Sequence, residues 1–474
     1  MPTPIPVEAT LEARIDSVFR DHDSTHSPGC AVGVVGKHGT TFSRGYGMAN
    51  LDHRVPIEPW TIFDVASVSK QFTAAVVLLL DREGALSLDD DIRDFLPGLP
   101  DYGERVTIRH LIHHTSGLRD YLVLLTLTGV ALDETFDGED VFELVARQEA
   151  LNFPPGENFL YSNTGYFLIS RIVREVTGQS LREYARDHLF RPLGMERTHF
   201  QDDPNEVVRY RAIGYAPRGS NNFVERRRPL HLVGDGGLMT SVEDLAIWER
   251  TFLGELPPNG DHRRELVSFL RERMAERGRL SDQATLLYSF GLTHGVHRRL
   301  PTSGHGGSFM GYQAEVLRFP GEDTSVTVLC NLSAARPRAL AREVADIILE
   351  GELGPRQEPA ERRSRPVLFR GSSSEEYEPF PEELEELSGD YYSEELGVTY
   401  RLRVRYGGLR IDEPAPLASH LVPEGRDTYR LGEVVLRFLR DDSGDVKELR
   451  LDAVRALDLR FERLPDRLGD DDRD

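Results

Sequence analysis

Ser67 and Lys70, three residues apart in Ser-Val-Ser-Lys, are the residues of this sequence best suited to chemistry. Lys70 is one of only three lysines among 474 residues, in a chain whose other long cationic side chains are all arginine. Arginine keeps its proton in proteins, whereas burial can make a lysine amine neutral, so this position favours a group that titrates. A neutral amine one helical turn from a serine hydroxyl can activate that serine as a nucleophile. For this motif alone, a helix cap followed by a solvated lysine is the alternative.

Two further motifs contain residue types that acyl transfer uses. Tyr161-Ser-Asn163 follows a Pro-Pro-Gly turn, and Gly304-His-Gly-Gly-Ser308 comes just ahead of an expected hairpin. A tyrosine can take or give a proton, and paired glycines let a substrate main chain approach a strand closely. Taken singly, the first motif also fits a turn that leads into an aromatic-lined helix, and the second also fits a flexible turn.

In this order, the three motifs resemble those of the serine β-lactamase and penicillin-binding-protein superfamily. The resemblance is strongest to the branch that contains class C β-lactamases, D-aminopeptidases, DD-peptidases and related esterases, and it covers about residues 10–350. Further stretches also look like this family: Phe63-Asp-Val-Ala-Ser-Val-Ser-Lys70, Leu111-Ile-His-His-Thr-Ser-Gly-Leu118, Arg191-Pro-Leu-Gly-Met195 and Gly234-Asp-Gly-Gly-Leu-Met-Thr-Ser241.

The resemblance implies a role for each residue of the first two motifs. Ser67 would be the nucleophile, and Lys70 and Tyr161 would share the proton that the serine gives up. Asn163 would orient Lys70 and a substrate amide. After acylation, Tyr161 would activate the incoming water or other acceptor. No metal ion or other cofactor is implied.

The third motif would complete the site. The main-chain N–H groups of Ser67 and Ser308 would form the oxyanion hole, and Gly306 and Gly307 would bind substrate. His305 stands where many β-lactamases have a lysine that anchors the substrate carboxylate, and histidine at this position resembles D-aminopeptidases and some DD-peptidases. Imidazole is a weaker and only partly charged anchor near neutral pH, which argues against efficient β-lactam hydrolysis. Packing beneath Tyr161 is the alternative role for His305.

The adjacent pair His113 and His114 does not predict a metal site. Neighbouring side chains point apart, and no further histidine or glutamate stands at ligand spacing. We interpret this pair as structural.

Hydrophobic periodicity predicts the elements that must position these motifs. An apolar helix face over residues 9–24 is followed by buried strands at 30–35 and up to Tyr46, and strands return at 313–319 and 325–330. Helices are predicted in between, at 71–82, 141–148, 165–177 and 242–253. The predicted fold class is therefore α/β in the α+β sense, a central antiparallel sheet built from both ends of a domain, flanked by helices, with an inserted helical region.

Composition divides the chain into further parts. We expect a hydrolase domain at 1–352, a linker at 353–380 rich in Pro, Glu, Arg and Ser, a small all-β domain at 381–467 and an acidic tail at 468–474. The all-β domain looks like the lipocalin-like barrel appended to some D-aminopeptidases. It would stabilise the protein or form a dimer contact; alternatively, one of its loops, such as 412–426, reaches the cleft and limits substrate length.

Charge and cysteine usage restrict partners and compartment. A formal charge of −22 argues against nucleic acid or an anionic membrane as a partner, and no run approaches the roughly 20 apolar residues that cross a bilayer. The N-terminus shows no secretory signal, so we expect a cytoplasmic protein, or an exported one if the native N-terminus has been replaced. The family fold implies that Cys30 lies near Cys330, and in a cytoplasmic protein both are expected to be free thiols.

The predicted function is that of a serine hydrolase that forms an acyl-enzyme on small peptide, amide or ester substrates, including those with a D-residue, as a D-aminopeptidase or DD-peptidase does. A carboxylesterase or weak β-lactamase of the same fold is the alternative within this class. A non-hydrolytic penicillin-binding or scaffold protein is the alternative from another class. The expected partner is a small molecule or short peptide, and a homo-oligomer is compatible with the sequence.

Overall fold

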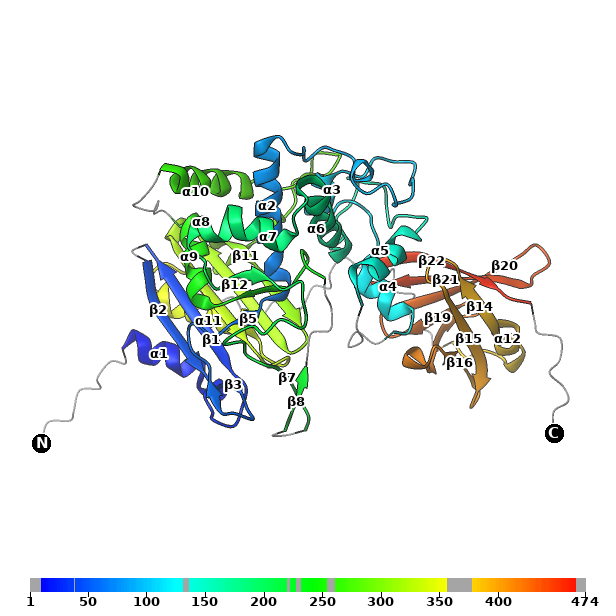
Figure 1. The fold of residues 1–474 in the computed structure, drawn as a ribbon. Coiled ribbons are helices and arrows are strands. Elements are labelled where there is room, and N and C mark those ends of the chain that lie inside the picture. The colour runs from blue at the N-terminus through cyan, green and yellow to red at the C-terminus, as the bar shows by residue number, and fades with distance from the viewer. Residues whose placement is uncertain are drawn as a thin grey trace, which may run out of the picture. The chain divides into compact units, whose positions relative to one another are not determined.

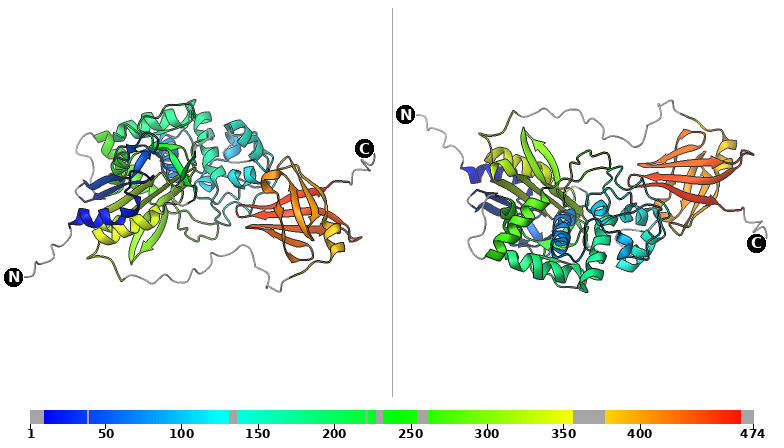
Figure 2. Two further views of the ribbon diagram at one scale, coloured as in Figure 1. Left: turned by 90° about the horizontal axis from the view of Figure 1, so that it is seen from below. Right: turned by 90° about the horizontal axis from the view of Figure 1, so that it is seen from above.

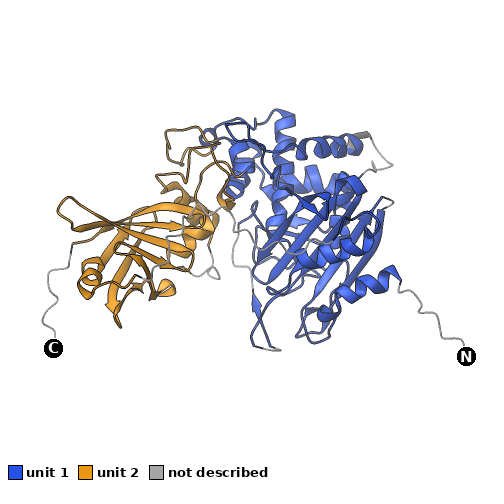
Figure 3. Ribbon diagram, turned by 180° about the vertical axis from the view of Figure 1, so that it is seen from behind, with its two compact units in different colours: residues 1–95, 107–113, 165–358 blue, residues 96–106, 114–164, 359–474 orange. Residues whose placement is uncertain are grey.

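The computed structural model describes residues 10–37, 39–130, 136–219, 222–226, 232–253, 261–355 and 377–465. The chain divides into two compact units, which Figure 3 colours separately: the first unit comprises residues 1–95, 107–113 and 165–358, and the second comprises residues 96–106, 114–164 and 359–474. Most of the predicted linker and the whole predicted tail lie outside the described residues. The domain boundaries drawn from the sequence stay a prediction.

A six-stranded antiparallel sheet forms the centre of the first unit (Figure 1). Its strands lie in the order β10-β11-β12-β13-β1-β2, so the beginning and the end of this unit meet where β1 pairs with β13. The bounds are β1 (Cys30–Gly36), β2 (Gly39–Tyr46), β10 (Thr293–His297), β11 (Leu300–Phe309), β12 (Tyr312–Phe319) and β13 (Thr324–Cys330). The predicted antiparallel sheet built from both ends is confirmed.

Helices cover both faces of this sheet. α1 (Leu11–Val18) and α11 (Pro337–Ile348) lie side by side against one face, as Figure 2 shows, and α9 (Val242–Phe252) packs against the other. Successive side chains of a strand point to opposite faces of the sheet. Alternate residues of β1 therefore face α1 and α11 on one side and α9 on the other. Val34 belongs to the core cluster beneath α1 and α11, whereas a Cβ atom on Gly33 would lie 3.2 Å from Cβ of Val242 in α9.

Cys30 and Cys330 form a disulfide inside that core cluster. The prediction that the two residues lie close together is right, since they are paired positions of β1 and β13. The prediction of free thiols is wrong. Directly opposed positions on neighbouring antiparallel strands bring two Cβ atoms within reach of a disulfide. The prediction of free thiols rests on the expected compartment alone, which says nothing about this strand pairing.

Helix α2 (Lys70–Glu83) is buried from Lys70 to Leu80, as expected for a helix that is apolar on all sides. The 3-10 turn η2 (Ala66–Ser69) leads into it, and Gly84, with φ of +72°, ends it in the left-handed conformation that favours glycine. Further helices are α3 (Ile108–Ile112), α6 (Asn163–Thr177), α7 (Leu181–Ala185), α8 (Arg191–Leu193) and α10 (Asp261–Met274). The helices predicted around residues 71–82, 165–177 and 242–253 are confirmed as α2, α6 and α9.

Short strands complete the first unit. They form a three-stranded sheet and two two-stranded ribbons: β5 (Phe63–Asp64) and β6 (His199–Phe200) beside β9 (Leu238–Thr240), β3 (Met48–Asn50) with β4 (Val55–Pro56), and β7 (Gly214–Pro217) with β8 (Phe223–Arg226). Because β5 ends at Asp64 and pairs with β9, this sheet holds the chain immediately before η2.

The second unit joins a helical segment to a nearly closed antiparallel barrel-like sheet, which confirms the predicted small all-β part. Its helices in the middle of the chain are α4 (Tyr121–Leu127) and α5 (Gly138–Ala146), the latter near the predicted 141–148. The nine strands lie in the order β17-β16-β15-β14-β22-β21-β20-β19-β18. After α12 (Pro381–Leu387), they are β14 (Gly389–Ser393), β15 (Val398–Arg405), β16 (Gly408–Glu413), β17 (Ser419–His420), β18 (Val422–Gly425), β19 (Thr428–Leu431), β20 (Val434–Arg440), β21 (Val446–Ala453) and β22 (Ala456–Arg463).

The interior of this sheet is filled by aromatic and aliphatic side chains. Tyr391 packs edge-on against Phe438, and Tyr400 packs against Phe461, with all four rings buried. The hydroxyl of Tyr400 donates a hydrogen bond to the main-chain O of Leu127 at the end of α4, which ties the helical segment to the sheet. Within the described ranges, no helix is both long enough and apolar enough to cross a membrane.

Candidate active site

Ser67 and Lys70 occupy the junction between a tight turn and a buried helix. Ser67 lies in the 3-10 turn η2, and Lys70 is the first residue of α2. The serine therefore precedes the helix by one 3-10 turn. A 3-10 turn has three residues per turn, which places residues 67 and 70 on the same side. Nζ of Lys70 donates a hydrogen bond to Oγ of Ser67 at 3.3 Å. The serine is half-buried and the lysine fully buried.

The turn that presents Ser67 begins at an unusual main-chain conformation. Ala66 has φ of +47°, a left-handed value that costs a non-glycine residue conformational energy and often marks a functional position. Its N–H donates to a carboxylate oxygen of Asp64 at 2.8 Å, which holds the turn in place.

A glycine-rich loop at residues 234–237 contacts the amine of Lys70. Nζ donates a hydrogen bond to the main-chain O of Asp235 at 2.7 Å and lies 5.5 Å from the ring centroid of Tyr166. The adjoining carbonyl, of Gly234, accepts from Oγ1 of Thr73 on the next turn of α2 at 2.8 Å. The stretch 234–241 is part of the family resemblance, but nothing in its residue types predicts that one of its carbonyl oxygens accepts a hydrogen bond from Lys70.

His305 sits on β11 in the same unit and is buried, with 6% of its surface exposed. Its Nδ1 is 2.6 Å from the main-chain O of Gly306, an atom that can only accept, so Nδ1 carries the proton. Nε2 then accepts a hydrogen bond from the hydroxyl of Tyr288 at 3.1 Å. Burial, followed by the charge of Lys70, lowers the pKa of His305 to about 4, so the ring is neutral near pH 7. The sequence predicted a partly charged imidazole; the structure makes it neutral.

The glycines beside His305 bring the main chain of β11 against η2. A Cβ atom on Gly307 would lie 2.1 Å from the carbonyl O of Val65 and 3.2 Å from N of Ser67. A Cβ atom on Gly306 would instead meet Oε2 of Glu315 at 2.8 Å, because alternate residues face opposite sides. Ser308 is exposed, and its hydroxyl accepts a hydrogen bond from Nε2 of Gln313. The oxyanion-hole role of the Ser67 and Ser308 N–H groups stays a prediction.

Tyr161 and Asn163 belong to the second unit. Asn163 is the first residue of α6, and both its main-chain N and its Nδ2 donate to Oδ2 of the fully buried Asp120, at 2.7 and 2.9 Å. The ring of Tyr161 packs on the ring of His114 at 4.3 Å between centroids, and Nδ1 of His114 accepts a hydrogen bond from N of Ser162. Asp120 and His114 therefore position this motif, a task that the sequence did not reveal.

The structure distributes the predicted residues over both units. The first unit contains Ser67, Lys70, His305 and the glycines 306 and 307, and the second contains Tyr161 and Asn163. His113 and His114 face different neighbours: Nδ1 of His113 donates to the main-chain O of Arg109, and its ring packs edge-on against Phe290. In the part of the chain that the structure describes, no three His, Cys, Asp or Glu side chains gather as metal ligands would.

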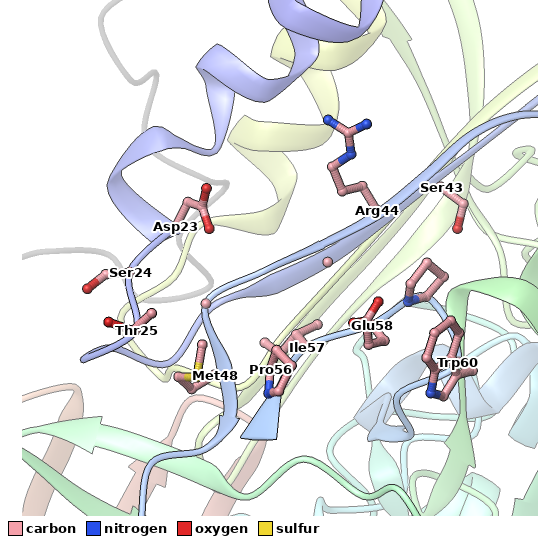
Figure 4. A pocket seen from close by; sticks show the side chains of 13 residues that line it. Asp23, Ser24, Thr25, Ser43, Arg44, Met48, Pro56, Ile57, Glu58 and Trp60 are labelled. Carbon is pink, nitrogen blue, oxygen red and sulfur yellow. The ribbon is translucent and has the colours of Figure 1, made fainter. Parts of the chain in front are cut away.

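A cavity of about 620 Å³ in the first unit lies at a different place (Figure 4). Its walls come from residues near the ends of α1 and β2 and from the chain around β4, including Asp23, Arg44, Met48, Glu58 and Trp60. The predicted catalytic residues are not among its lining residues, so this cavity is not the candidate active site.

Comparisons with known proteins show which family the chain resembles. The family model described as Beta-lactamase matches residues 12–349. A D-aminopeptidase of Cereibacter sphaeroides is 31% identical over 335 residues, which is 69% of this chain and 60% of that protein. A D-aminopeptidase of Gluconobacter oxydans is 29% identical over 385 residues, which is 81% of this chain and 66% of that protein. This chain thus spans less than two thirds of the length of these relatives.

Among solved structures, the octameric penicillin-binding protein homologue from Pyrococcus abyssi has the same fold. It superposes with a TM-score of 0.60 at 24% sequence identity, over 95% of this chain and 98% of that chain. This match extends over both units.

Proposed function

Because this chain belongs to the β-lactamase family, we propose that it is a serine hydrolase that forms an acyl-enzyme on small peptide or amide substrates with an N-terminal D-residue. One observation carries the proposal: the buried amine of Lys70 lies 3.3 Å from the hydroxyl oxygen of Ser67. Burial disfavours the charged form of a lysine amine, so a buried amine can serve as a base. A lysine in solvent would stay protonated at neutral pH and could not. The D-aminopeptidase names of two relatives support the substrate class.

In the proposed reaction, Oγ of Ser67 attacks the substrate carbonyl carbon, and its proton passes to the base that Lys70 and Tyr161 share. The carbonyl oxygen becomes an oxyanion, which the N–H groups of Ser67 and Ser308 stabilise. Collapse of this intermediate breaks the C–N bond, and the leaving amine takes the proton. Water, deprotonated by the same base, then attacks the ester carbonyl and releases Ser67.

A neutral His305 supports an aminopeptidase over a β-lactamase. β-Lactam recognition benefits from a fixed positive charge for the substrate carboxylate, and a histidine with a pKa of about 4 does not supply one at neutral pH. A peptide amide cleaved near its N-terminus has no carboxylate at the reacting residue. The octameric state of the Pyrococcus abyssi homologue supports a homo-oligomer for this chain as well.

A reagent assay and a substrate panel test this proposal. We expect a fluorophosphonate to add to wild-type protein at one site, and we expect no adduct on Ser67→Ala. We expect Lys70→Arg to react at least about 100-fold more slowly, since arginine keeps its proton. In the panel, D-alanine p-nitroanilide should be cleaved faster than the L-enantiomer and faster than a chromogenic cephalosporin. Cleavage of p-nitrophenyl esters alone would make the protein an esterase, and an equal adduct on Ser67→Ala would refute the nucleophile.

A further inference from the structure

The turn between β21 and β22 brings the barrel-like sheet to the Tyr161-Ser-Asn163 motif within the second unit. At this turn, the main-chain O of Arg455 accepts hydrogen bonds from N of Asp120 at 3.0 Å and from Nδ2 of Asn152 at 3.2 Å. N of Leu457 donates to Oδ1 of Asn152 at 2.8 Å. These bonds use only the main chain of the turn, so they fix its position whatever side chain stands at residue 455.

The side chain of Arg455 lies near Tyr161 and pairs with Asp120, the residue that holds Asn163. Nη1 lies 3.3 Å from Oδ2 of Asp120, the oxygen that also accepts both hydrogen bonds from Asn163. The guanidinium carbon lies 5.9 Å from the ring centroid of Tyr161. Asp120 is fully buried, and a charge pair with a buried partner is screened less than one at the surface. Arg455 is thus a positive charge linked to Asn163 through Asp120 and adjacent to Tyr161.

Docking of the turn does not require this guanidinium, because another arginine performs that task. Arg119, whose side chain is 1% exposed, donates to the main-chain O atoms of Leu457 and Asp458 at 3.1 and 3.2 Å. It also pairs with Glu395 of the barrel-like sheet. The Arg455 side chain is 27% exposed and adds no main-chain contact of this kind. The contacts of the Arg455 side chain are instead with Asp120 and with the ring of Tyr161.

We propose that Arg455 is a positioning residue for the acyl-transfer site: through Asp120 it fixes the amide of Asn163, and its charge favours the phenolate form of Tyr161. This inference rests on the proposed function. Without Arg455, neither the buried carboxyl group of Asp120 nor a negative charge on Tyr161 would have this cation beside it. The sequence also suggests that residues 412–426 reach the cleft and limit substrate length, which stays a prediction. Pro414 of that loop lies beside Gly129, just after α4.

The test compares Arg455→Gln, Arg455→Lys and wild type by the rate of fluorophosphonate addition to Ser67 between pH 5.5 and 9.5. This rate reports the base directly and needs no knowledge of the natural substrate. For Arg455→Gln, we expect a loss of about 10-fold at pH 7 and an acidic limb moved upward by about 0.5 to 1 pH unit, because a cation near the base is gone. Arg455→Lys keeps the charge, so we expect its acidic limb to stay at the wild-type position.

Arg460→Gln is the matched control, since this exposed arginine of β22 pairs with Glu448 and Glu462 inside the barrel-like sheet. We expect it to react as wild type does. An unmoved limb in Arg455→Gln, or the same shift in Arg460→Gln, would overturn the inference while leaving the proposed function intact. An unreactive wild type would overturn both. Thermal unfolding of each variant identifies a loss of rate that comes from misfolding. In that case the limb position of Arg455→Gln decides, because a smaller folded fraction lowers the rate at every pH and does not move the limb.

Discussion

Gly307 lies so close to Ser67 that a Cβ atom on the glycine would come within 3.2 Å of the serine's main-chain N. The same atom would come 2.1 Å from the carbonyl O of Val65, a distance that no two such atoms can adopt. The main chain of β11 therefore runs directly beside the turn that presents the predicted nucleophile. An oxyanion hole made of main-chain N–H groups depends on such an approach, because its donors must be fixed before the reaction starts.

We expect Gly307→Ala to reduce kcat/KM by about 100-fold or more. The added methyl meets main-chain atoms, which cannot rotate away, so β11 and η2 must move apart, and displacements of about 1 Å at a reacting centre have such effects. Gly295→Ala on β10 is the matched control, at a position with no predicted role in the site. Its methyl would lie 3.3 Å from Oγ1 of the Thr302 side chain and would meet no main-chain atom, so we expect less than about a 10-fold loss. Steady-state kinetics with the best substrate of the panel measures both, and equal losses would contradict this account.

The sequence predicted those parts of the fold and the site that depend on local spacing. The three-residue step from Ser67 to Lys70 sets their proximity in either a 3-10 or an α-helical turn, and runs of apolar residues define β1 and β13. The carbonyl of Asp235 that receives Lys70 was not predictable, because any residue has such a group and only tertiary structure selects one. Burial of His305 is likewise a tertiary property, which is why its neutral state had not been foreseen.

The partners of the Tyr161 motif were missed for a related reason. Asp120 is more than 40 residues from Asn163 in the chain, and Arg455 is on the far side of the predicted linker. Aspartate and arginine are common on surfaces, so neither residue type marks a site by itself. Only the packing of the segment 114–164 with the barrel-like sheet identifies them.

We expect His305 to make the protein sensitive to mild acid. Its pKa is lowered to about 4 in the folded protein, so between pH 6.5 and 4 the unfolded state binds a proton that the folded state excludes. Stability is therefore lost as the pH falls through this window, by about 2 to 3 kcal/mol at pH 4.5. Urea unfolding at pH 7 and 4.5 should show that His305→Gln loses less than wild type by this amount. The pKa of buried His113 and that of half-buried His294 are also lowered, but both residues remain in both proteins, so their contributions cancel. Equal losses would refute a neutral His305.

Glu315 should have the opposite pH dependence. It lies on β12 opposite Gly306, and burial raises its pKa to about 7, against the opposing effect of Arg338 and Arg342. In the unfolded chain it ionises near pH 4.5, so stability is lost as the pH rises from 4.5 to 7, and the loss persists above that pH. We expect Glu315→Gln to raise the free energy of unfolding by about 2 to 3 kcal/mol at pH 8.5 and to change it little at pH 4.5.

The control for Glu315 is Glu343→Gln on α11, an exposed position where we expect little change at either pH. Denaturant unfolding followed by far-UV circular dichroism measures each variant. A Glu315→Gln variant that gains as much stability at pH 4.5 as at pH 8.5 would show that packing, and not a buried carboxyl, is responsible.

The Cys30–Cys330 disulfide should contribute strongly to stability, because it closes a loop with a sequence separation of 300 residues. Loop-closure entropy for a loop of this length corresponds to about 6 kcal/mol, so we expect the double variant Cys30→Ala, Cys330→Ala to unfold at clearly lower urea concentration. Reductant should bring wild type to the same midpoint and leave the variant unchanged. Since a reducing cytoplasm keeps thiols free, alkylation of intact cells before lysis tells whether the bond exists where the protein resides. Complete alkylation of both cysteines in unreduced, purified protein would contradict the disulfide.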